Sequence, residues 1–470
     1  MNYLKLINKH GISGINHQYL YKFKNNKELN NAIFTALPKL YNKNEIDYQK
    51  NTLNFYHKDL IVPYNSVTAQ GPWIIGDNGS ILYDVGGYGM LGFGHNPEWA
   101  NKILAKPQVM ANVMTPNKNQ LKFTNVLKKN IGINRKRNIC PYEKFGFLNS
   151  GSEAIELATK ICDSIYKDSK KESIYIVLEG SFHGRTGNAS KLSDSCKNNY
   201  QSNLKSFQHK IPVYTVPINN IQQFITTFNL LKTKYTIEAV FFEPVMGEGN
   251  PGIELNKEFY HIARKMTKEN KSLLIIDSIQ AGIRTNGYLS IVDYPKIKNE
   301  DPPDMEIFSK AVNSGQYPLS VLAVSKEISD QFKTGIYGNT MTGNPKAMDI
   351  GIETLSRLND DVRKNIILKG YSFFYMLQKM KNNYPYMVEK ITGQGLLLAM
   401  HIKKEYKVID SNKGLEYICR KNGLNVIHGG DNALRFTPYF LINDDEIDLV
   451  HKILETSFDE YTNRFIRKIT

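Results

Sequence analysis

Short apolar runs alternate with longer helical patterns through the middle of the chain, and this alternation constrains the fold more than any other feature. The runs are Ser173–Leu178, Ala239–Phe242, Ser272–Ile276 and Leu319–Val324, after a shorter one at Lys144–Leu148. The helical patterns lie around 118–130, from Ser152 onward and over Lys257–Glu269. Strands that take turns with helices build a mostly parallel sheet. The sequence therefore predicts an α/β fold.

The length of 470 residues predicts more than one domain. Residues 1–84 are expected to form an N-terminal arm and part of a small domain, in which a hairpin strand over 79–85 follows the turn Asp77-Asn78-Gly79. Residues 85–343 are expected to form a large domain around the parallel sheet. Residues 344–470 are expected to form a smaller C-terminal α+β domain.

Charge and cysteine content bear on partners and compartment. Lys and Arg outnumber Asp and Glu by 60 to 45, but the charges are scattered and no block of like charges suggests a nucleic-acid arm. Four cysteines lie far apart without CxxC pairs, which favours reduced thiols. No apolar run approaches the roughly 20 residues of a membrane span. We expect a cytoplasmic protein without nucleic-acid or membrane partners; an acid-free stretch over 1–27 only weakly indicates organellar import.

Polar residues directly after the apolar runs are candidate ligand contacts, because ligands of open α/β sheets bind beyond the carboxyl ends of the strands. Ser150, Gly151 and Ser152 leave the short run at 144–148 and enter a helix. Backbone N–H groups and the helix dipole at this point could hold a phosphate. The alternative is an ordinary helix cap at Ser152.

The loop 179–186 follows the next run and brings an aromatic ring, the imidazole of His183 and a guanidinium close together. Phe182 could stack on a flat cofactor ring, and Arg185 could bind a carboxylate with two hydrogen bonds. The alternative is a solvated loop with one buried aromatic. Glu243, at the next strand end, either neutralises an arginine in the site or caps a neighbouring loop.

Two residues further along suggest cofactor chemistry. Asp277 ends the most hydrophobic run, where a buried carboxylate needs a partner such as a protonated pyridine nitrogen. Gln280 could then reach the ring hydroxyl, although Asp277 could instead be a helix cap. Lys310 lies 33 residues later beside the apolar stretch 305–307. Such surroundings depress a lysine pKa and favour Schiff-base chemistry.

Taken in this order, the five segments closely resemble the class III aminotransferases, the pyridoxal 5'-phosphate group that includes ornithine, lysine and 4-aminobutyrate aminotransferases. The resemblance runs from about Trp73 to Ile447 and implies a fold-type I transferase. The chain departs from the family pattern at three places: Ser278 for a glutamate, Ile155 for a common asparagine, and Arg284-Thr285-Asn286 for glycine-arginine-threonine.

The resemblance implies a role for each cofactor contact. Phosphate binding falls to Ser150, Gly151 and Ser152, ring stacking to Phe182, the pyridine nitrogen to Asp277, the ring oxygen to Gln280, and the Schiff base to Lys310, with His183 among the contacts. Thr340 resembles the threonine that reaches the phosphate of a neighbouring subunit, which implies a homodimer with shared active sites. Thr342 is the alternative, or both are turn residues.

The implied activity is transamination, from an amino acid or ω-amino acid such as lysine, ornithine or 4-aminobutyrate to a keto acid such as 2-oxoglutarate, with no metal. Lys310 and Asp277 are the expected catalytic residues. Arg435 resembles the carboxylate-binding arginine that pairs with the glutamate matched by Glu243, and Arg185 is the second carboxylate ligand. Racemase, aminomutase and decarboxylase reactions on the same cofactor remain open. A non-enzymatic nucleic-acid binder rests on the net charge of +15 alone.

Overall fold

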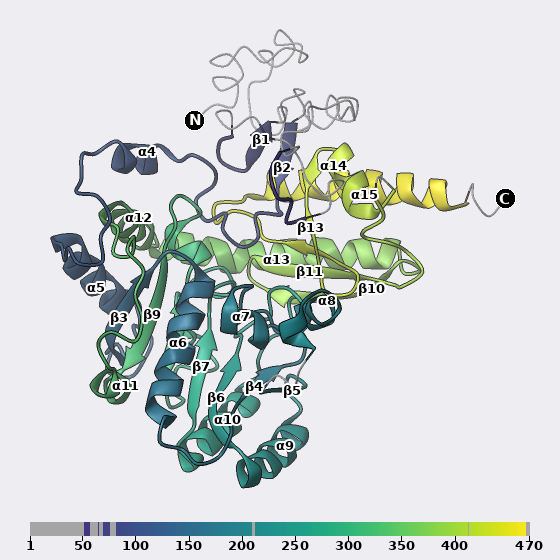
Figure 1. Cartoon of the computed structure of the whole chain (residues 1–470). Coiled ribbons are helices and arrows are strands. Elements are labelled where there is room, and N and C mark those ends of the chain that lie inside the picture. Colours follow the sequence, from purple (N-terminus) through teal and green to yellow (C-terminus); the bar gives the residue numbers. More distant parts are fainter. Residues whose placement is uncertain are drawn as a thin grey trace.

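A seven-stranded sheet forms the centre of the computed structural model, which describes residues 51–56, 64, 69–75, 81–208, 212–411 and 413–466 (Figure 1). The strand order is β3-β9-β8-β7-β6-β4-β5. The strands are β3 (Tyr142–Leu148), β4 (Ser173–Leu178), β5 (Val213–Val216), β6 (Thr236–Phe242), β7 (Leu273–Asp277), β8 (Met305–Phe308) and β9 (Ser320–Ser325). β9 alone runs opposite to the other six strands of this sheet. The predicted α/β fold with a mostly parallel sheet is confirmed.

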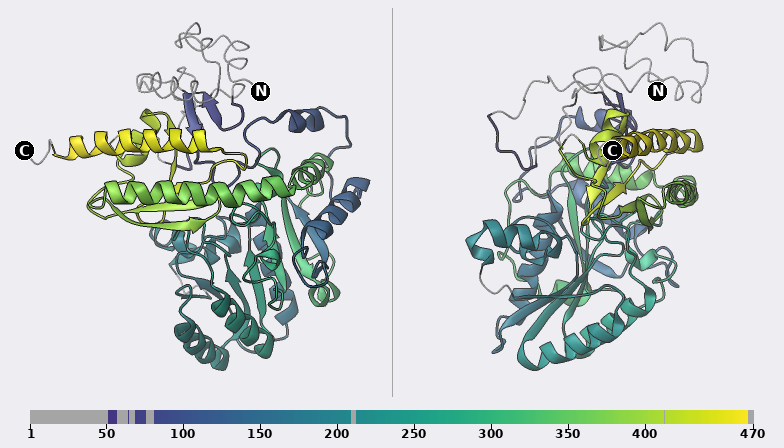
Figure 2. Two further views of the ribbon diagram at one scale, coloured as in Figure 1. Left: turned by 180° about the vertical axis from the view of Figure 1, so that it is seen from behind. Right: turned by 90° about the vertical axis from the view of Figure 1, so that its right-hand side faces the viewer.

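Helices cover both faces of this sheet (Figure 2). Successive side chains of a strand point to opposite faces. On β4, Ile176 therefore packs in the core that includes residues of α9 (Ile221–Lys234) and α10 (Lys257–Asn270), whereas Val177 packs in the core of α6 (Gly151–Tyr166). Both faces of the central strands are buried, which explains why their sequences read as continuous apolar runs.

The remaining helices before residue 357 flank the large sheet or connect its strands, except α4, which packs on α12. They are α4 (Glu98–Leu104), α5 (Lys118–Asn130), α7 (Gly187–Leu192), α8 (Lys197–Asn203), α11 (Lys326–Gln331) and α12 (Pro345–Ser356). Helix α5 has the bounds expected from the sequence, and its N-terminus is fixed by a capping box between Asn117 and Gln120. None of the helices in the described part of the chain is long and apolar enough to span a membrane.

A four-stranded antiparallel sheet, in the order β10-β11-β14-β13, lies beside the carboxyl edge of the large sheet (Figure 1). Its strands are β10 (Val388–Gln394), β11 (Leu397–Ile402), β13 (Ile427–Gly429) and β14 (Ala433–Phe436). Helix α13 (Asp360–Asn383) packs on β10, and α15 (Asp444–Ile466) packs on α13 and α14 (Leu415–Lys421). Residues of these elements, such as Arg435, line one cavity together with residues that follow strands of the large sheet.

A third, small sheet joins the two ends of the chain. β2 (Ile81–Asp84) pairs antiparallel with β1 (Trp73–Ile75) and parallel with β12 (Leu424–Asn425). The strand expected over 79–85 is therefore present, whereas the turn Asp77-Asn78-Gly79 and the segment 1–27 lie outside the described residues. The domain boundaries at residues 84 and 343 remain a prediction.

Arg284 ties the large sheet region to the C-terminal region from within the core. Its side chain is fully buried and donates to four backbone carbonyls, those of Gly89, Leu91, Leu396 and Pro438. No carboxylate pairs with it among the described residues. Burial, only partly offset by the charge of Asp84, lowers the pKa of the guanidinium to about 9. The side chain thus fixes the loop that contains Gly89 against the segments that contain Leu396 and Pro438.

We expect Arg284→Met to lower the free energy of unfolding by about 2–4 kcal/mol, because four carbonyls lose their donor in a buried place. Thermal unfolding followed by circular dichroism measures the effect. The matched control is Arg357→Met, which removes a half-exposed arginine at the C-terminal end of α12. Arg357 pairs with Glu353 and lies over the ring of Trp99, and its loss should cost less than about 1 kcal/mol. Equal losses in the two variants would contradict the role given to Arg284.

Candidate active site

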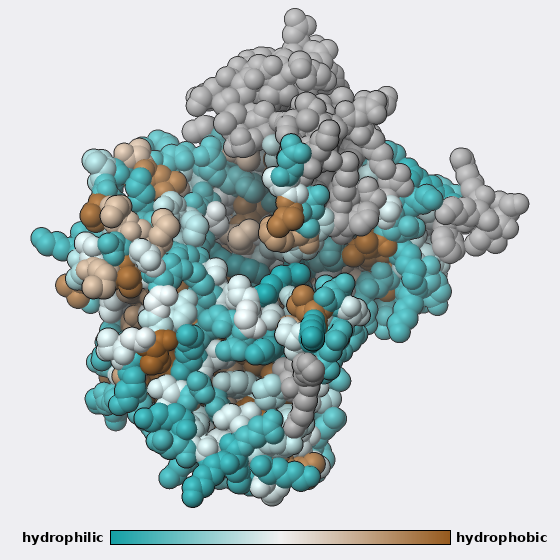
Figure 3. Space-filling view, in the orientation of Figure 1, coloured by the Kyte–Doolittle hydropathy of each residue, from teal (hydrophilic) through white to brown (hydrophobic). Residues whose placement is uncertain are grey.

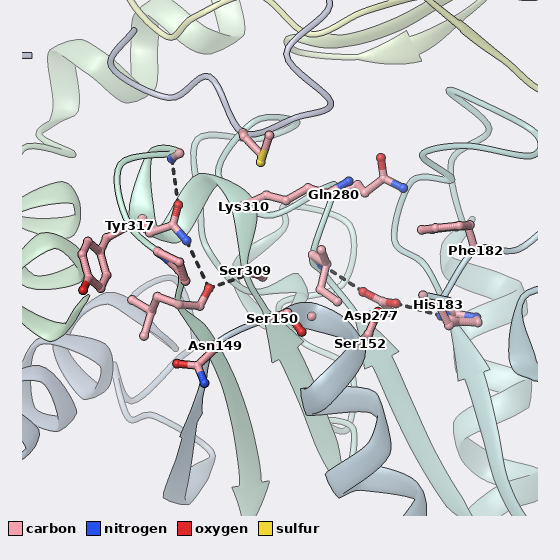
Figure 4. A pocket seen from close by; sticks show the side chains of 18 of the residues that line it. Asn149, Ser150, Ser152, Phe182, His183, Asp277, Gln280, Ser309, Lys310 and Tyr317 are labelled. Atoms are coloured by element: carbon pink, nitrogen blue, oxygen red, sulfur yellow. Dashed lines mark hydrogen bonds and ion pairs between the residues drawn. The ribbon is translucent and has the colours of Figure 1, made fainter. Parts of the chain in front are cut away.

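The strand-end residues singled out in the sequence lie around one cavity at the carboxyl edge of the large sheet (Figure 4). The cavity has a volume of about 410 Å³. Eight expected cofactor contacts line it: Ser150, Gly151, Ser152, Phe182, His183, Asp277, Gln280 and Lys310. The topology explains this convergence, because β4, β6, β7 and β8 are parallel and end at the same edge.

The N-terminus of α6 borders the cavity. Ser150 is the N-cap residue: its side chain accepts from the N–H of Glu153, whose carboxylate accepts from the Ser150 N–H. The alternative that placed the cap at Ser152 is therefore wrong by two residues. A Cβ on Gly151 would lie 2.6 Å from a methyl carbon of Ile279, so glycine permits the close approach of this loop. The first turn leaves backbone N–H groups that suit a phosphate.

Asp277 is buried at the end of β7 and uses both carboxylate oxygens. One accepts from the N–H of Ile279 at 3.0 Å, and the other lies 2.8 Å from Nδ1 of His183. Burial alone would lower the pKa of His183, but the hydrogen bond and charge of Asp277 outweigh it and raise that pKa. The alternative of a helix cap is wrong, because turns and not a helix follow Asp277, and the contact with Ile279 closes the first of these turns. The pairing with His183 shows that Asp277 does more than cap a turn.

Lys310 starts the 3₁₀ turn 310–313 directly after β8, with φ at 46°. Its side chain points along the cavity toward Gln280 (Figure 4). A Cβ on Gly89 would lie 3.6 Å from Cδ of Lys310, so the loop fixed by Arg284 packs against the lysine. Burial first, and the charge of Arg435 second, lower the pKa of the ammonium to about 8. At pH 7 about a tenth of this amine would therefore be neutral and nucleophilic, against less than about a thousandth of an ordinary lysine.

Cofactor capture by cofactor-free protein should accordingly follow a pH midpoint near 8 rather than near the ordinary lysine value of about 10.4. The neutral amine attacks, so the rate should rise with pH and then level off. Between about pH 8 and about pH 10.4 the unfolded chain keeps a proton on this lysine that the folded chain has lost. Lys310 therefore makes the free energy of unfolding rise with pH in that range. Stopped-flow absorbance after adding pyridoxal 5'-phosphate measures the rate; a midpoint above about 10 would contradict the lowered pKa.

A second cavity of about 730 Å³ is lined by residues of the large-sheet region and of the C-terminal region, including Tyr56, Tyr88, Arg185, Glu248 and Arg435. The Arg185 guanidinium lies 5.5 Å from the ring centroid of Tyr56 and 5.6 Å from that of Phe182. Its Nη2 lies 3.5 Å from a carboxylate oxygen of Glu248. Sequence reasoning missed Tyr56, which lies in the polar N-terminal segment, and Glu248.

The structure differs from the expected pairing of Arg435 with Glu243. Both oxygens of Glu243 accept backbone N–H groups, those of Phe182 and Gly247, each at 3.0 Å. Burial, partly offset by His183, raises the pKa of Glu243 to about 7. The carboxylate that lies 4.0 Å from Arg435 is Glu248. Glu243 therefore holds two loops together, and Glu248 is the acid that faces the arginines.

Thr340 lies outside both cavities and is exposed. Its carbonyl accepts from the N–H of Val113 at 2.9 Å. The hydroxyl of Thr342, the alternative residue, is buried and donates to the carbonyl of Asn339 at 2.8 Å. Of the two threonines, only Thr340 has a side chain that faces outward.

The parallel sheet, the helix N-terminus, the buried carboxylate and the buried lysine define a fold-type I pyridoxal 5'-phosphate enzyme. The family described as Aminotransferase class-III matches residues 55–458. The chain is 31% identical over 348 residues to the acetylornithine aminotransferase of Clostridium acetobutylicum, covering 73% of this chain and 81% of that protein. It is 27% identical over 311 residues to the ornithine aminotransferase of Brevibacillus brevis, covering 64% and 71%.

Solved structures show the same fold. The ornithine aminotransferase of Toxoplasma gondii superposes with a TM-score of 0.76 at 22% identity, covering 94% of this chain and 99% of that one. The chain belongs to the class III aminotransferases and is a pyridoxal 5'-phosphate-dependent enzyme that transfers amino groups to keto acids.

The cavity fits this cofactor on its own chemistry. The helix N-terminus offers N–H groups to a phosphate, Asp277 offers a carboxylate to a pyridinium nitrogen, and Lys310 offers an amine to a carbonyl carbon. In addition, Nε2 of Gln280 is buried and has no hydrogen-bond partner in the described part of the chain, so it can donate to a bound group.

Proposed function

We propose that the preferred amino donor is an ω-amino acid whose far end is a free α-amino acid group, as in ornithine. The observation that carries this proposal is the pairing of Arg185 with Glu248 beside Tyr56 in the second cavity. A guanidinium suits the α-carboxylate, and a carboxylate suits the α-ammonium. N-acetylornithine is the second candidate because several relatives are named acetylornithine aminotransferases. It has a neutral amide there, so Glu248 would gain no cationic group from that substrate.

Lys310 and Asp277 are assigned the proton chemistry. When bound, pyridoxal 5'-phosphate supplies an electron sink for the substrate carbon. Lys310 would hold the cofactor through its amine; as a neutral base it would take a proton from the substrate carbon, and as an acid it would donate that proton to the cofactor's former carbonyl carbon. Asp277 keeps a proton on the pyridine nitrogen, and His183 keeps Asp277 in place. Phe182 excludes water from one face of the site.

Arg435 and Glu248 are proposed to let the site bind first the amino donor and then the keto-acid acceptor. With a donor in place, Glu248 neutralises the two arginines that it faces. With 2-oxoglutarate in place, the two carboxylates of the acceptor bind the arginines, and Glu248 is displaced. One pocket can then serve both half-reactions, with Arg185 and Arg435 orienting the carboxylates.

A homodimer is proposed from the surface around Thr340. Exposed apolar side chains gather beside it, on the side of the molecule where α4, α5 and α12 lie (Figure 3). They are Val109, Met110, Val113, Met114 and Met341, of which Met114 is 83% exposed. An apolar patch of this kind is typical of a protein interface. A second copy placed there would bring its Thr340 toward this chain's phosphate site.

The working compartment is proposed to be the cytoplasm, with no nucleic-acid or membrane partner. The four cysteines are all free, and two of them, Cys162 and Cys419, are buried. Free thiols of this kind suit a reducing compartment. The scattered lysines and arginines offer no continuous basic arm.

The test compares kcat/KM for L-ornithine, N-acetyl-L-ornithine and 4-aminobutyrate, each with 2-oxoglutarate, in the wild type and in Glu248→Gln. Ornithine should be preferred at least tenfold over its acetyl derivative, and Glu248→Gln should reduce this preference by about tenfold. A wild type that prefers N-acetylornithine would overturn the ornithine proposal. Product formation that does not need a keto acid would instead favour a racemase, aminomutase or decarboxylase.

A further inference from the structure

Gln280 joins the two cavities through the two ends of one side chain. Its Oε1 accepts from Nη1 of Arg435 at 3.2 Å. Its Nε2 belongs to the same amide and is buried without a partner among the described residues. Gln280 also lines the cavity that contains Lys310. One amide therefore contacts the substrate-side arginine and presents unused N–H groups on the cofactor side.

The orientation of this amide is fixed by its surroundings. A guanidinium can only donate, so the amide oxygen must face Arg435 and the NH₂ group must face away from it. A Cβ on Gly247 would lie 2.2 Å from Cδ of Gln280, so glycine at this position lets the amide pack against the backbone. The carbonyl of Gly247 also accepts from Nη1 of Arg435. The turn at Gly247 thus contacts the side chains of both Gln280 and Arg435 and fixes their positions relative to each other.

Hydrogen bonds in a chain strengthen one another. A donor at the amide oxygen polarises the amide and makes its N–H groups better donors, and the effect is larger in a buried site. Arg435 is buried and has a competing acceptor, since Glu248 lies 4.0 Å from Nη1. A carboxylate that binds Arg435 and draws it from Gln280 therefore weakens the N–H groups at the other end of the amide.

We propose that Gln280 is a positioning residue that relays the state of Arg435 to the cofactor's ring oxygen, so that a carboxylate bound on the substrate side changes the proton affinity of the cofactor. This inference rests on the proposed roles of Gln280 and Arg435. The amide N–H groups stabilise negative charge on the ring oxygen while Arg435 donates to the amide. When Arg435 no longer donates to the amide, the N–H groups stabilise that negative charge less, and the proton affinity of the ring oxygen rises.

The experiment is a double-mutant cycle read from the pH midpoint of the visible absorbance of cofactor-loaded protein. Four proteins are compared: wild type, Arg435→Met, Gln280→Met and the double variant. Arg435→Met should raise the midpoint in both backgrounds because a cation is lost, but by at least about half a pH unit more when Gln280 is present. Lys404→Met is the control, because it removes a cation that lines the second cavity without a contact to Gln280, Arg435 or Glu248 in the described structure, and its shift should be equal in both backgrounds.

Glutarate, a five-carbon dicarboxylate without an amino or keto group, provides a second readout. Saturating glutarate should raise the midpoint in the wild type and by at least about half a unit less in Gln280→Met. If Gln280→Met does not retain cofactor, Gln280→Asn takes its place, since its shorter amide cannot span both contacts.

Equal Arg435 shifts and equal glutarate shifts in the two backgrounds would overturn the relay and show that Arg435 acts through its field alone. A protein that shows no absorbance band with added pyridoxal 5'-phosphate would instead refute the proposed roles of the cofactor residues. The two failures are therefore distinguishable.

Discussion

Lys310→Ala should abolish amino transfer, with kcat/KM lower by about 10⁴-fold or more. The variant loses the amine that attaches the cofactor and also the base that moves the proton at the substrate carbon. No other lysine lines the described cavity, so no neighbouring amine can replace it. Steady-state rates with ornithine and 2-oxoglutarate measure the loss in the variant. Borohydride reduction of the wild type, followed by peptide mapping, shows whether the cofactor is attached at residue 310.

The control for this variant is Lys326→Ala, which removes a surface lysine paired with Asp330. Its side chain is 77% exposed, so rates and thermal stability should stay close to those of the wild type. Residual activity of Lys310→Ala within about tenfold of the wild type, or cofactor fixed by borohydride at another lysine, would refute the assignment of Lys310.

The sheet could be predicted because its central strands are buried on both faces, which leaves continuous apolar runs such as that of β4. The reversed direction of β9 could not, since a buried strand reads alike in either direction. The sheet that joins β1 and β2 to β12 was also beyond local patterns. Its pairing depends on contacts between opposite ends of the chain, and no local signal indicates which strands will meet.

The cofactor cavity was predicted better than the substrate cavity, for a physical reason. Cofactor contacts follow the ends of parallel strands, and topology brings those ends together. Tyr56 reaches Arg185 only through the tertiary fold. The sequence likewise cannot tell which of Glu243 and Glu248 faces Arg435, because the choice depends on which carboxylate accepts the loop N–H groups.

One departure from the family pattern has a structural explanation. Ser278 stands where a glutamate is usual, and its hydroxyl donates to the buried carboxylate of Glu306 on the neighbouring strand at 2.5 Å. Glu306 also accepts from Tyr142 and from the N–H of Ile291. An acidic group is therefore present beside residue 278, although it comes from β8.

Asp277→Asn should lower kcat by about 10³-fold while cofactor remains attached to Lys310. Asparagine keeps the size of the side chain and can still accept the N–H of Ile279, but it cannot hold a proton on the pyridine nitrogen. Rates fall for that reason and not through loss of the fold. The absorbance spectrum, borohydride fixation and single-turnover rate with ornithine separate binding from chemistry.

His183→Asn is the informative comparison, because the side chain of His183 bonds to Asp277 and is expected to act on the reaction through that carboxylate. Its Nδ1 lies 2.8 Å from the carboxylate, and its Nε2 is buried without a partner among the described residues. The loss should be smaller, about 10- to 100-fold, as is usual when an orienting partner is removed. In the double variant the two effects should not multiply, because without the carboxylate the imidazole has nothing to orient. Fully multiplicative losses would mean that His183 contacts the reacting groups directly.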